Sequence, residues 1–335
     1  MPETSHPSVL PPARGAGIRE VARLSGVSIA TVSRVFNDAA SVRPETRRRV
    51  LERAAALDYE PSSLGRNLVR GRSELLGLIV PNVSFPLYGE MISGIEDVLG
   101  ARGMSILLAF SHDDAASERA AGQKMRRHAV DGGIVIHSRL DCAPGAPRGL
   151  RWVQVAPERP ASPCRVELDN QQGGRLAARE LLGLKRRHLA FVGAPGRESA
   201  ERERGFAAEL RRAGREYRRA GGDFSELSGL RAAEELLADA SPLDAVFVAG
   251  DLMAVGVLRA LHQRGLRVPG DVAVVGFDDA PLAALLYPRL TSVRQPAYAM
   301  GAAAADLALR LLGGHSADPV TFAPELVRRE STGPP

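Results

Sequence analysis

The chain contains few cysteines, lysines and aromatic residues, and it has no long run of apolar residues. Cys142 and Cys164 are its only cysteines, too few for a disulfide framework or for a zinc site built from thiolates. No stretch of about eighteen apolar residues occurs, which argues against a membrane-spanning helix. The first residues lack a basic stretch followed by an apolar one, so we expect no secretory signal and a cytoplasmic protein.

The sequence also lacks the motifs of common enzyme classes. No G-x-G-x-x-G follows a predicted strand, and neither a phosphate-binding loop nor a G-x-S-x-G nucleophile elbow is present. The histidines are scattered, without a pair at metal-ligand spacing. The sequence therefore predicts a protein that is not an enzyme and that uses no cofactor and no bound metal.

Lysine is nearly absent, and the charge is unevenly distributed. Only Lys124 and Lys185 are lysines, whereas the whole chain carries 44 basic and 39 acidic residues, a net charge of +5. Between Ala13 and Arg72, twelve arginines and six carboxylates give +6, which leaves about −1 for the remainder. A basic N-terminal segment on a near-neutral body is typical of a nucleic-acid-binding module joined to another domain. A genome that favours arginine codons would explain the shortage of lysine, but not this asymmetry.

The N-terminal part predicts a small helical unit. Residues 1–16 are proline-rich and are expected to form a disordered tail. Apolar residues then recur at helical spacing, where Gly26 is expected to end a first helix, Ser28 to cap a second, and Pro44 to begin a third. Three short helices joined by a tight turn form a helix-turn-helix unit.

After residue 73 the pattern changes to alternating strands and helices. The 335-residue chain is 44% hydrophobic and 25% charged, as expected for one to three globular domains. Strands are predicted at 75–80, 105–110, 133–137, 152–155, 189–192, 245–249 and 272–277. Helices are predicted near 88–101, 171–183, 200–213, 226–238 and 251–264. Two successive series of β-α-β units predict an α/β core of two doubly wound parallel-sheet lobes.

The second helix of the N-terminal unit is the expected DNA-reading element, with its N-terminal end toward the bases of a major groove. Hydroxyl side chains suit phosphates, aliphatic ones suit a thymine methyl, and Arg34 can bond a guanine edge with two parallel hydrogen bonds. The expected DNA contacts on this helix are Ser28, Ile29, Ala30, Thr31, Ser33, Arg34 and Asn37. An ordinary helical hairpin with a solvated arginine is the alternative.

Residues 18–37 resemble the DNA-binding headpiece of the LacI/GalR (lactose-repressor) family of bacterial transcriptional regulators. Further landmarks of that family follow in order at residues 42–46, 59–61, 79–81, 130–134, 250–256, 274–279 and 290–296. The resemblance runs from about residue 17 to residue 331, and it implies a core similar to periplasmic binding proteins.

The resemblance also implies domain boundaries. It places the headpiece at 17–60, a hinge helix or linker at 61–72, and an effector-binding core at 73–331. Since the chain of such a core crosses between its lobes three times, the N-lobe is expected at 73–163 and 294–319, and the C-lobe at 164–293 and 320–331.

In function, the resemblance implies a sequence-specific transcriptional regulator, most often a repressor. It would act as a homodimer on a pseudo-palindromic double-stranded operator, under control of a small-molecule effector, such as a sugar or another small metabolite, held between the lobes. Leu68 matches a linker leucine that the family inserts into the minor groove. Packing between Pro61 and the core is the alternative for Leu68.

The resemblance assigns an effector site to Tyr88, Arg202, Phe224 and Asp278. An arginine and a carboxylate would bond hydroxyl groups, while aromatic rings would cover the apolar face of a polar ring-like ligand. Each assignment has an alternative: Arg202 as a surface ion pair, Phe224 as a core residue, and Asp278 as the cap of a turn.

Two departures from the family pattern affect that site. Gly250 stands where an asparagine is common, and Ala156 and Pro157 stand where an acidic or arginine pair often follows the fourth strand. Both remove polar groups that would hold a polyol. We therefore expect a less hydroxylated or anionic effector, or none.

Two other functions compete with that of a regulator. A solute-binding protein for transport would explain the two lobes but not the headpiece. A cytoplasmic enzyme on a doubly wound fold is disfavoured because its site motifs are missing.

Overall fold

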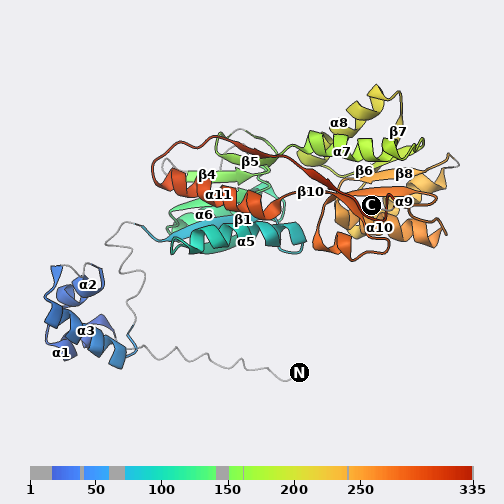
Figure 1. Ribbon diagram of the computed structural model, residues 1–335. Helices are drawn as coiled ribbons and strands as arrows, with labels where there is room; N and C mark the ends of the chain where they lie inside the picture. Colours follow the sequence, from blue (N-terminus) through green and yellow to red (C-terminus); the bar gives the residue numbers. More distant parts are fainter. Residues whose placement is uncertain are drawn as a thin grey trace, which may run out of the picture. The chain divides into compact units, whose positions relative to one another are not determined.

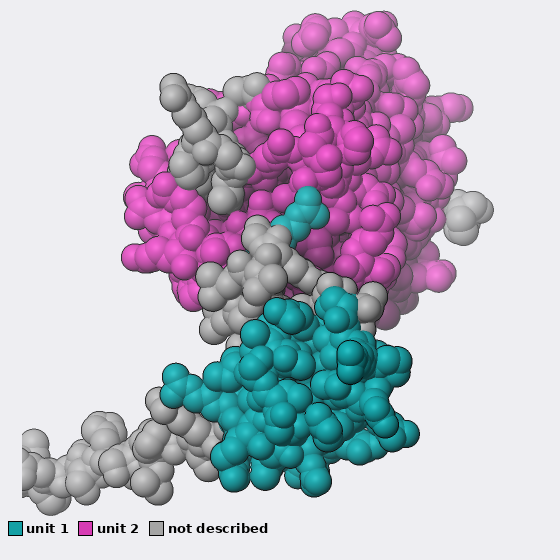
Figure 2. All heavy atoms as spheres, turned by 90° about the vertical axis from the view of Figure 1, so that its left-hand side faces the viewer, with its two compact units in different colours: residues 1–73 teal, residues 74–335 magenta. Residues whose placement is uncertain are grey.

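The structure is a computed structural model that describes residues 17–37, 41–59, 72–140, 151–160, 162–239 and 241–333. The chain divides into two compact units, residues 1–73 and 74–335, which Figure 2 shows in separate colours. The division falls beside residue 73, where the strand–helix alternation of the sequence begins.

Unit 1 contains the helices α1 (Ile18–Ser25), α2 (Ile29–Asn37) and α3 (Pro44–Ala56). All three predicted helix boundaries are confirmed. Gly26 ends α1 in the left-handed conformation, with φ of 62°. The hydroxyl oxygen of Ser28 accepts a hydrogen bond from the Thr31 N–H at 3.1 Å, which caps α2. Pro44 occupies the first turn of α3, where its missing N–H costs no hydrogen bond.

A small apolar core holds these helices together. Its buried residues are Val21, Ala22, Val32, Val35, Val50 and Ala54. Each fully buried valine stabilises such a unit by roughly 1.5–3 kcal/mol relative to an exposed one. Since each of the three helices contributes to this one cluster, the unit has a hydrophobic core of its own.

In unit 2, the first sheet is entirely parallel. Its strands are β1 (Leu75–Val80), β2 (Ser105–Phe110), β3 (Gly132–Ile136), β4 (Arg151–Val155), β5 (Arg165–Leu168) and β11 (Val320–Phe322). They lie in the order β11-β5-β4-β3-β1-β2. Its helices are α5 (Pro86–Gly100), α6 (Ala115–Arg127) and α11 (Ala297–Leu312).

Both faces of this sheet are covered, as predicted for a doubly wound lobe. Leu76 and Leu78 of β1 belong to the same buried cluster as Ile95 of α5, and α11 packs beside α5 (Figure 1). Ile79 of the same strand belongs instead to a cluster with Met125 of α6. Because successive strand residues point to opposite faces, these contacts place α6 on the other side from α5.

The second sheet contains β6 (Leu189–Gly193), β7 (Tyr217–Gly221), β8 (Ala245–Val248), β9 (Ala273–Asp278), β10 (Thr291–Arg294) and β12 (Glu325–Val327). They lie in the order β12-β10-β9-β8-β6-β7, and only the edge pair β10–β12 is antiparallel. Helices α7 (Asn170–Gly183) and α8 (Arg197–Arg212) pack together, as do α9 (Glu226–Ala238) and α10 (Asp251–Gln263), around this sheet (Figure 1). A short 3₁₀ helix, η2 (Pro281–Ala284), follows β9.

The predicted lobe boundaries are wrong by a few residues. Strand β5 pairs with β4, and β11 pairs with β5, so both belong to the first sheet. The family resemblance places residues 164–293 and 320–331 in the other lobe. These strands are short and only partly buried, so their apolar pattern is too weak to show which sheet they join.

Two features are absent from the described part of the chain. None of its helices combines the length and the hydrophobicity needed to cross a bilayer. Nor do three or more histidine, cysteine or acidic side chains come together there in a way that could hold a metal ion.

Candidate functional site

The solvent-facing side of α2 carries the expected DNA contacts. Ser28, Ile29, Ala30 and Arg34 are exposed, and Thr31 and Ser33 are half-buried. The opposite side of the helix carries Val32 and Val35, which are buried in the unit's core. Ile29 is 46% exposed, so its side chain is accessible to a partner. Asn37 ends α2, but its side chain lies outside the described part of the structure, and so does Leu68.

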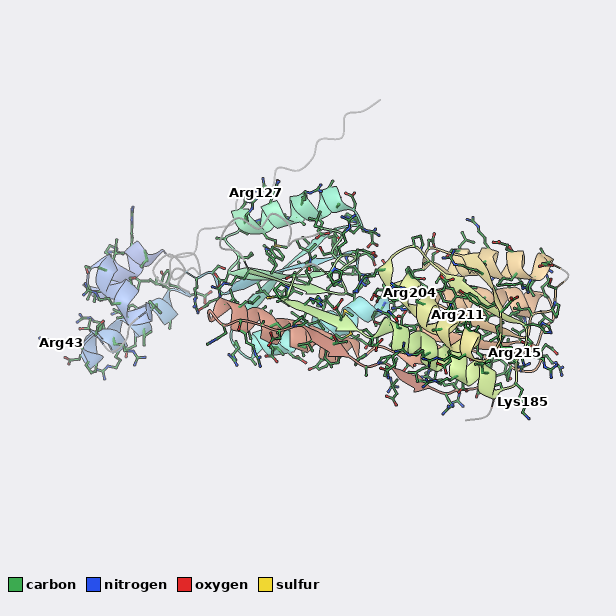
Figure 3. The ribbon with its side chains drawn as sticks, turned by 90° about the horizontal axis from the view of Figure 1, so that it is seen from above. Arg43, Arg127, Lys185, Arg204, Arg211 and Arg215 are labelled. Carbon is green, nitrogen blue, oxygen red and sulfur yellow. The ribbon has the colours of Figure 1, made fainter. Side chains whose placement is uncertain are left out.

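Exposed arginines are spread over all three helices of unit 1. The exposed ones are Arg19, Arg23, Arg34, Arg43, Arg47, Arg48, Arg49 and Arg53, and Figure 3 labels Arg43. Arg23 pairs with Glu20 within one helix, and Arg48 lies 3.9 Å from Glu52. Exposed guanidiniums of this kind neutralise DNA phosphates and supply affinity that falls steeply with salt.

Within unit 2, a cavity of about 430 Å³ lies where strands of both sheets end. Its lining comes from the loops that follow β1, β2, β3, β4, β6, β7 and β10, from the end of β9, and from the starts of α5, α8 and α10. This is the edge at which α/β sheets bind ligands. All four residues assigned to an effector site, Tyr88, Arg202, Phe224 and Asp278, line this one cavity.

Arg202, on α8, is held by several groups at once. Its Nε donates to Oδ1 of Asn170 at 2.9 Å, its Nη1 donates to the carbonyl oxygen of Ala249, and its guanidinium carbon lies 3.7 Å from the centroid of the Phe277 ring. Helix α8 approaches α7 closely at Gly174, where a Cβ would lie 1.9 Å from the Arg202 carbonyl oxygen. The side chain is 2% exposed, so the interpretation as a surface ion pair is wrong.

Asp278 is the last residue of β9, and one of its carboxylate oxygens, Oδ1, faces Arg202. Its Oδ1 accepts a hydrogen bond from Nε2 of Gln295 and lies 3.7 Å from Nη1 of Arg202. Its Oδ2 has no hydrogen-bond partner among the described residues. Burial raises the pKa of Asp278 to about 6, although Arg202 and the Gln295 amide favour the charged form. The backbone N–H of Asp251 also favours the charged form, so the carboxylate is mostly ionised at neutral pH.

Aromatic rings line the cavity from both lobes. Tyr88, on α5, is buried and meets the ring of His137 edge-on, with 5.7 Å between centroids. Burial raises the pKa of Tyr88 above its ordinary value, so its hydroxyl stays protonated. Phe224 packs against the core on one side and lines the cavity with the other. Its φ of 69°, like the 109° of Asp278, is a strained backbone conformation of the kind that gathers at binding sites.

The structure adds polar residues that the sequence did not single out. Nδ1 of His137 lies 3.3 Å from Oε2 of Glu198, whose other oxygen lies 3.9 Å from Arg202. Glu158 lines the cavity just after β4, so it restores a carboxylate at the place where Ala156 and Pro157 had suggested a loss of polarity. His137 and Glu158 share one sequence signal with Asp278, a position at or just after the carboxyl end of a predicted strand, whereas Glu198 lies on α8 and has no such signal.

Comparisons with known proteins agree with this arrangement. Residues 17–62 match the bacterial regulatory proteins of the lacI family, and residues 178–332 match the periplasmic binding protein-like domain. The regulator CelR of Thermobifida fusca is 36% identical over 337 residues, which cover 93% of this chain and 96% of CelR. The chain belongs to the LacI family. The GalR regulator of Salmonella typhimurium is 33% identical over 96% of this chain and 97% of GalR.

Solved structures of LacI-family proteins share the whole fold. The lac repressor dimer bound to operator and the anti-inducer ONPF has a TM-score of 0.89 at 25% identity, and the match covers 96% of this chain and 100% of that one. The CelR–cellobiose complex has a TM-score of 0.71 at 33% identity, with 94% and 99% covered.

These findings confirm the predicted family, the fold and the general function. The protein is a DNA-binding transcriptional regulator with a helix-turn-helix unit and a ligand-binding core similar to periplasmic binding proteins. A transport protein for solutes would not carry the headpiece that residues 17–62 match. The relatives are regulators of transcription, not enzymes.

Proposed function

We propose that this LacI-family protein represses transcription and that a small molecule in the core cavity sets its affinity for the operator. The observation that carries the proposal is the meeting of Tyr88, Arg202, Phe224 and Asp278 around one cavity, although they are far apart in the sequence. A ligand there would contact both lobes, because Tyr88 belongs to the first sheet's lobe and the other three to the second. It would thus favour one lobe arrangement over another, which is what allosteric control requires.

The helix α2 is the proposed reading element. Arg34 would bond a guanine edge, Ile29 and Ala30 would make apolar contacts with bases, and the hydroxyls of Ser28, Thr31 and Ser33 would bond phosphates. The exposure of these side chains supports the assignment. The roles of Asn37 as a DNA contact and of Leu68 as a wedge in the minor groove rest on the family resemblance.

Within the cavity, each proposed effector contact has a distinct task. Arg202 is anchored by its own neighbours, so it presents a fixed positive surface that orients Asp278. Asp278 would accept a hydrogen bond from the ligand, and Tyr88 and Phe224 would cover its apolar face. Relatives of known structure hold cellobiose and ribose, both polar ring compounds.

The protein is proposed to act as a homodimer in the cytoplasm. The lac repressor match is a dimer on its operator, and a two-fold operator calls for two headpieces. On the core, Leu285 is 83% exposed and Tyr287 is 97% exposed, close together in the loop after η2. Apolar side chains this exposed suit burial against a second copy.

Operator binding by the full-length protein tests the proposal. The protein's own upstream DNA and a scrambled fragment of the same length and composition are compared by fluorescence anisotropy at a fixed salt concentration, alone and with metabolites. We expect tight binding to the upstream DNA only, and its release by a compound that also raises the melting temperature. Equal affinity for both fragments would refute sequence-specific regulation.

A further inference from the structure

The start of α8, in the second lobe, lies directly against the first lobe. A Cβ built on Gly196, which precedes the helix, would lie 2.7 Å from Oε1 of Glu158, and the φ of 110° at Gly196 is one that side chains rarely allow. Glu158 follows β4, and its backbone N–H donates to the carbonyl oxygen of Ser138, just after β3, at 2.9 Å. Glu158 is therefore fixed to the first lobe, and the glycine lets the second lobe come this close to it.

Arg197, the first residue of α8, bonds the first lobe through three separate groups. Its backbone N–H donates to Oε2 of Glu158 at 2.9 Å, its Nε donates to the carbonyl oxygen of Pro157 at 2.9 Å, and its Nη2 donates to Oε1 of Glu167 at 2.7 Å. Pro157 and Glu158 follow β4, and Glu167 lies on β5, so all three acceptors belong to the lobe of the first sheet. Its Nη1 instead stays within the second lobe and donates to Oε1 of Glu201 at 3.2 Å.

The ion pair between Arg197 and Glu167 is held in place on both sides. The two side chains are 18% and 13% exposed, so water and salt screen their charges less than on an open surface. The second oxygen of Glu167 accepts a hydrogen bond from Nε of Arg165 at 2.6 Å, which fixes the carboxylate where Arg197 meets it. A charge-assisted hydrogen bond between two ordered groups is stronger than one between mobile surface side chains.

The contacts of Arg197 border the wall of the cavity. Its two neighbours in the chain, Gly196 and Glu198, line the cavity, and so does Glu158. Oε2 of Glu198 also lies 3.3 Å from Nδ1 of His137, just after β3, which adds another contact between the lobes. A separation of α8 from the first lobe would therefore change the shape of the cavity.

Three crossings of the chain connect the two lobes. The chain passes from β5 to α7, from β10 to α11 and from β11 to β12, and each crossing joins elements of different lobes. A rotation about such crossings is the hinge motion by which two-lobed proteins open and close around ligands. It would separate Arg197 from Pro157 and Glu167, which belong to the other lobe. The bonds of Arg197 therefore stabilise the lobe arrangement in which they form.

We propose that Arg197 is a latch between the lobes: its bonds to Pro157, Glu158 and Glu167 hold one lobe arrangement without the help of a ligand. An effector that binds the latched arrangement finds the cavity already formed and loses less affinity to reorganisation. An effector that requires another arrangement has to break these bonds first. The latch thus sets how much free energy an effector must supply to change operator affinity. The latch follows from these contacts alone, whereas its effect on DNA binding rests on the proposed effector control.

The distance between the lobes in the full-length protein tests the latch. Spin labels are attached after Arg127→Cys on α6 of the first lobe and Arg211→Cys on α8 of the second, two exposed positions that Figure 3 labels. Cys142 and Cys164 are replaced by serine, and labelled chains are diluted with unlabelled ones, so that double electron–electron resonance measures distances within one chain. We expect the wild type to show one main distance without any added compound, the distance that the latched structure has.

Reversal of the charge at Arg197 should release the latch. Arg197→Glu places a carboxylate against Glu158 and Glu167, so we expect a second distance to become the main one and the ratio of latched to unlatched molecules to fall about a hundredfold or more. Arg197→Lys keeps the charge but not the fork of donors, so its distribution should lie between the two. Arg204→Glu is the matched control, because it makes the same charge change at a 60% exposed position of α8 and should keep the wild-type distance.

Two results would overturn the inference. One is the wild-type distance in a folded Arg197→Glu variant, and the other is a wild type in which the latched distance is not the main one. If circular dichroism shows that Arg197→Glu does not fold, the double variant Arg197→Ala with Glu167→Gln is measured under the same criterion, since it removes the ion pair without adding a charge.

Operator affinity of the same variants separates the latch from the proposed function. Fluorescence anisotropy is measured with upstream and scrambled DNA and without added compound. We expect Arg197→Glu to change the affinity for upstream DNA about fivefold or more relative to Arg204→Glu, and to leave scrambled DNA unaffected. A changed distance with unchanged operator affinity would leave the latch standing and would refute the control of DNA binding by the lobe arrangement.

Discussion

Nη1 of Arg202 lies 3.7 Å from Oδ1 of Asp278, and each side chain is 2% exposed. This ion pair links α8 to the end of β9, and both residues line the cavity. Arg202 also bonds Asn170 and Ala249, whereas Oδ2 of Asp278 has no side-chain or backbone partner within hydrogen-bond distance among the described residues. The arginine is thus an internal part of the scaffold, and the aspartate is the group that we propose contacts a ligand.

Removal of Arg202 should destabilise the core. Arg202→Ala leaves Asp278 as a buried charge without its cation, and we expect a loss of about 3–5 kcal/mol in the free energy of unfolding. Arg204→Ala is the control, because Arg204 is 60% exposed on the same helix and its 3.9 Å pair with Glu201 should contribute below about 1 kcal/mol. Urea unfolding of both variants measures the difference. Equal losses in the free energy of unfolding would mean that the buried Arg202 stabilises the core no more than the exposed Arg204 does.

The pH dependence of stability should reveal the buried carboxylate. Burial raises the pKa of Asp278 from 3.8 to about 6, so the folded protein holds this proton more tightly than the unfolded chain does. Stability contributed by the protonated group is therefore present in full below about pH 4 and is lost as pH rises through 6.

Asp278→Asn should weaken that trend. Without ligand at pH 8, we expect the variant to be more stable than the wild type by on the order of 1–3 kcal/mol, since it removes a buried charge. Part of the pH dependence should remain, because burial and the nearby Asp278 charge raise the pKa of Asp251 as well. Urea unfolding at pH 5 and pH 8 gives the comparison. A variant less stable than the wild type at pH 8 would show that the ionised form of Asp278 stabilises the fold.

Close packing of α7 on α8 should depend on glycine. A Cβ at Gly205 would lie 1.9 Å from the carbonyl oxygen of Gln171, so Gly205→Ala must push the helices apart. We expect overpacking to cost about 1–3 kcal/mol, whereas Gly183→Ala on α7 meets nothing within 4 Å and should leave stability nearly unchanged. Thermal unfolding followed by circular dichroism measures both. Similar melting temperatures for the two variants would show that the helices adjust without cost.

Sequence preference of the headpiece should depend on Arg34. Arg34→Ala is expected to cost about 1–3 kcal/mol in operator binding and to relax the preference at one base pair. Arg43→Ala, which removes another exposed arginine of unit 1, should weaken all DNA about equally. Anisotropy titrations with single-base operator variants separate the two effects. A uniform loss on Arg34→Ala would identify Arg34 as a phosphate contact only.

Local signals explain why the headpiece was predictable from the sequence. Gly26 ends α1, Ser28 caps α2 and Pro44 opens α3 through interactions within a few residues, which a sequence displays directly. The predicted lobe boundaries were wrong because they depend on long-range contacts and not on local signals. Strands β5 and β11 are four and three residues long, and the sheet they join is decided by partners far along the chain.

The cavity was predictable only in part. Arg202 and Asp278 were named from the family resemblance, but nothing local could show that Arg202 is buried against Phe277. His137 and Glu198 come from different lobes, and their 3.3 Å contact depends on the packing of the two lobes.

The most direct test of the account is an operator titration of the full-length protein at fixed salt, with and without the strongest compound from the metabolite screen. We expect the wild type to bind its upstream DNA at least about a thousandfold more tightly than scrambled DNA. The compound should weaken the operator complex and should leave the scrambled complex unchanged. A compound that binds the core cavity but leaves operator affinity unaltered would contradict the claim that this cavity controls DNA binding.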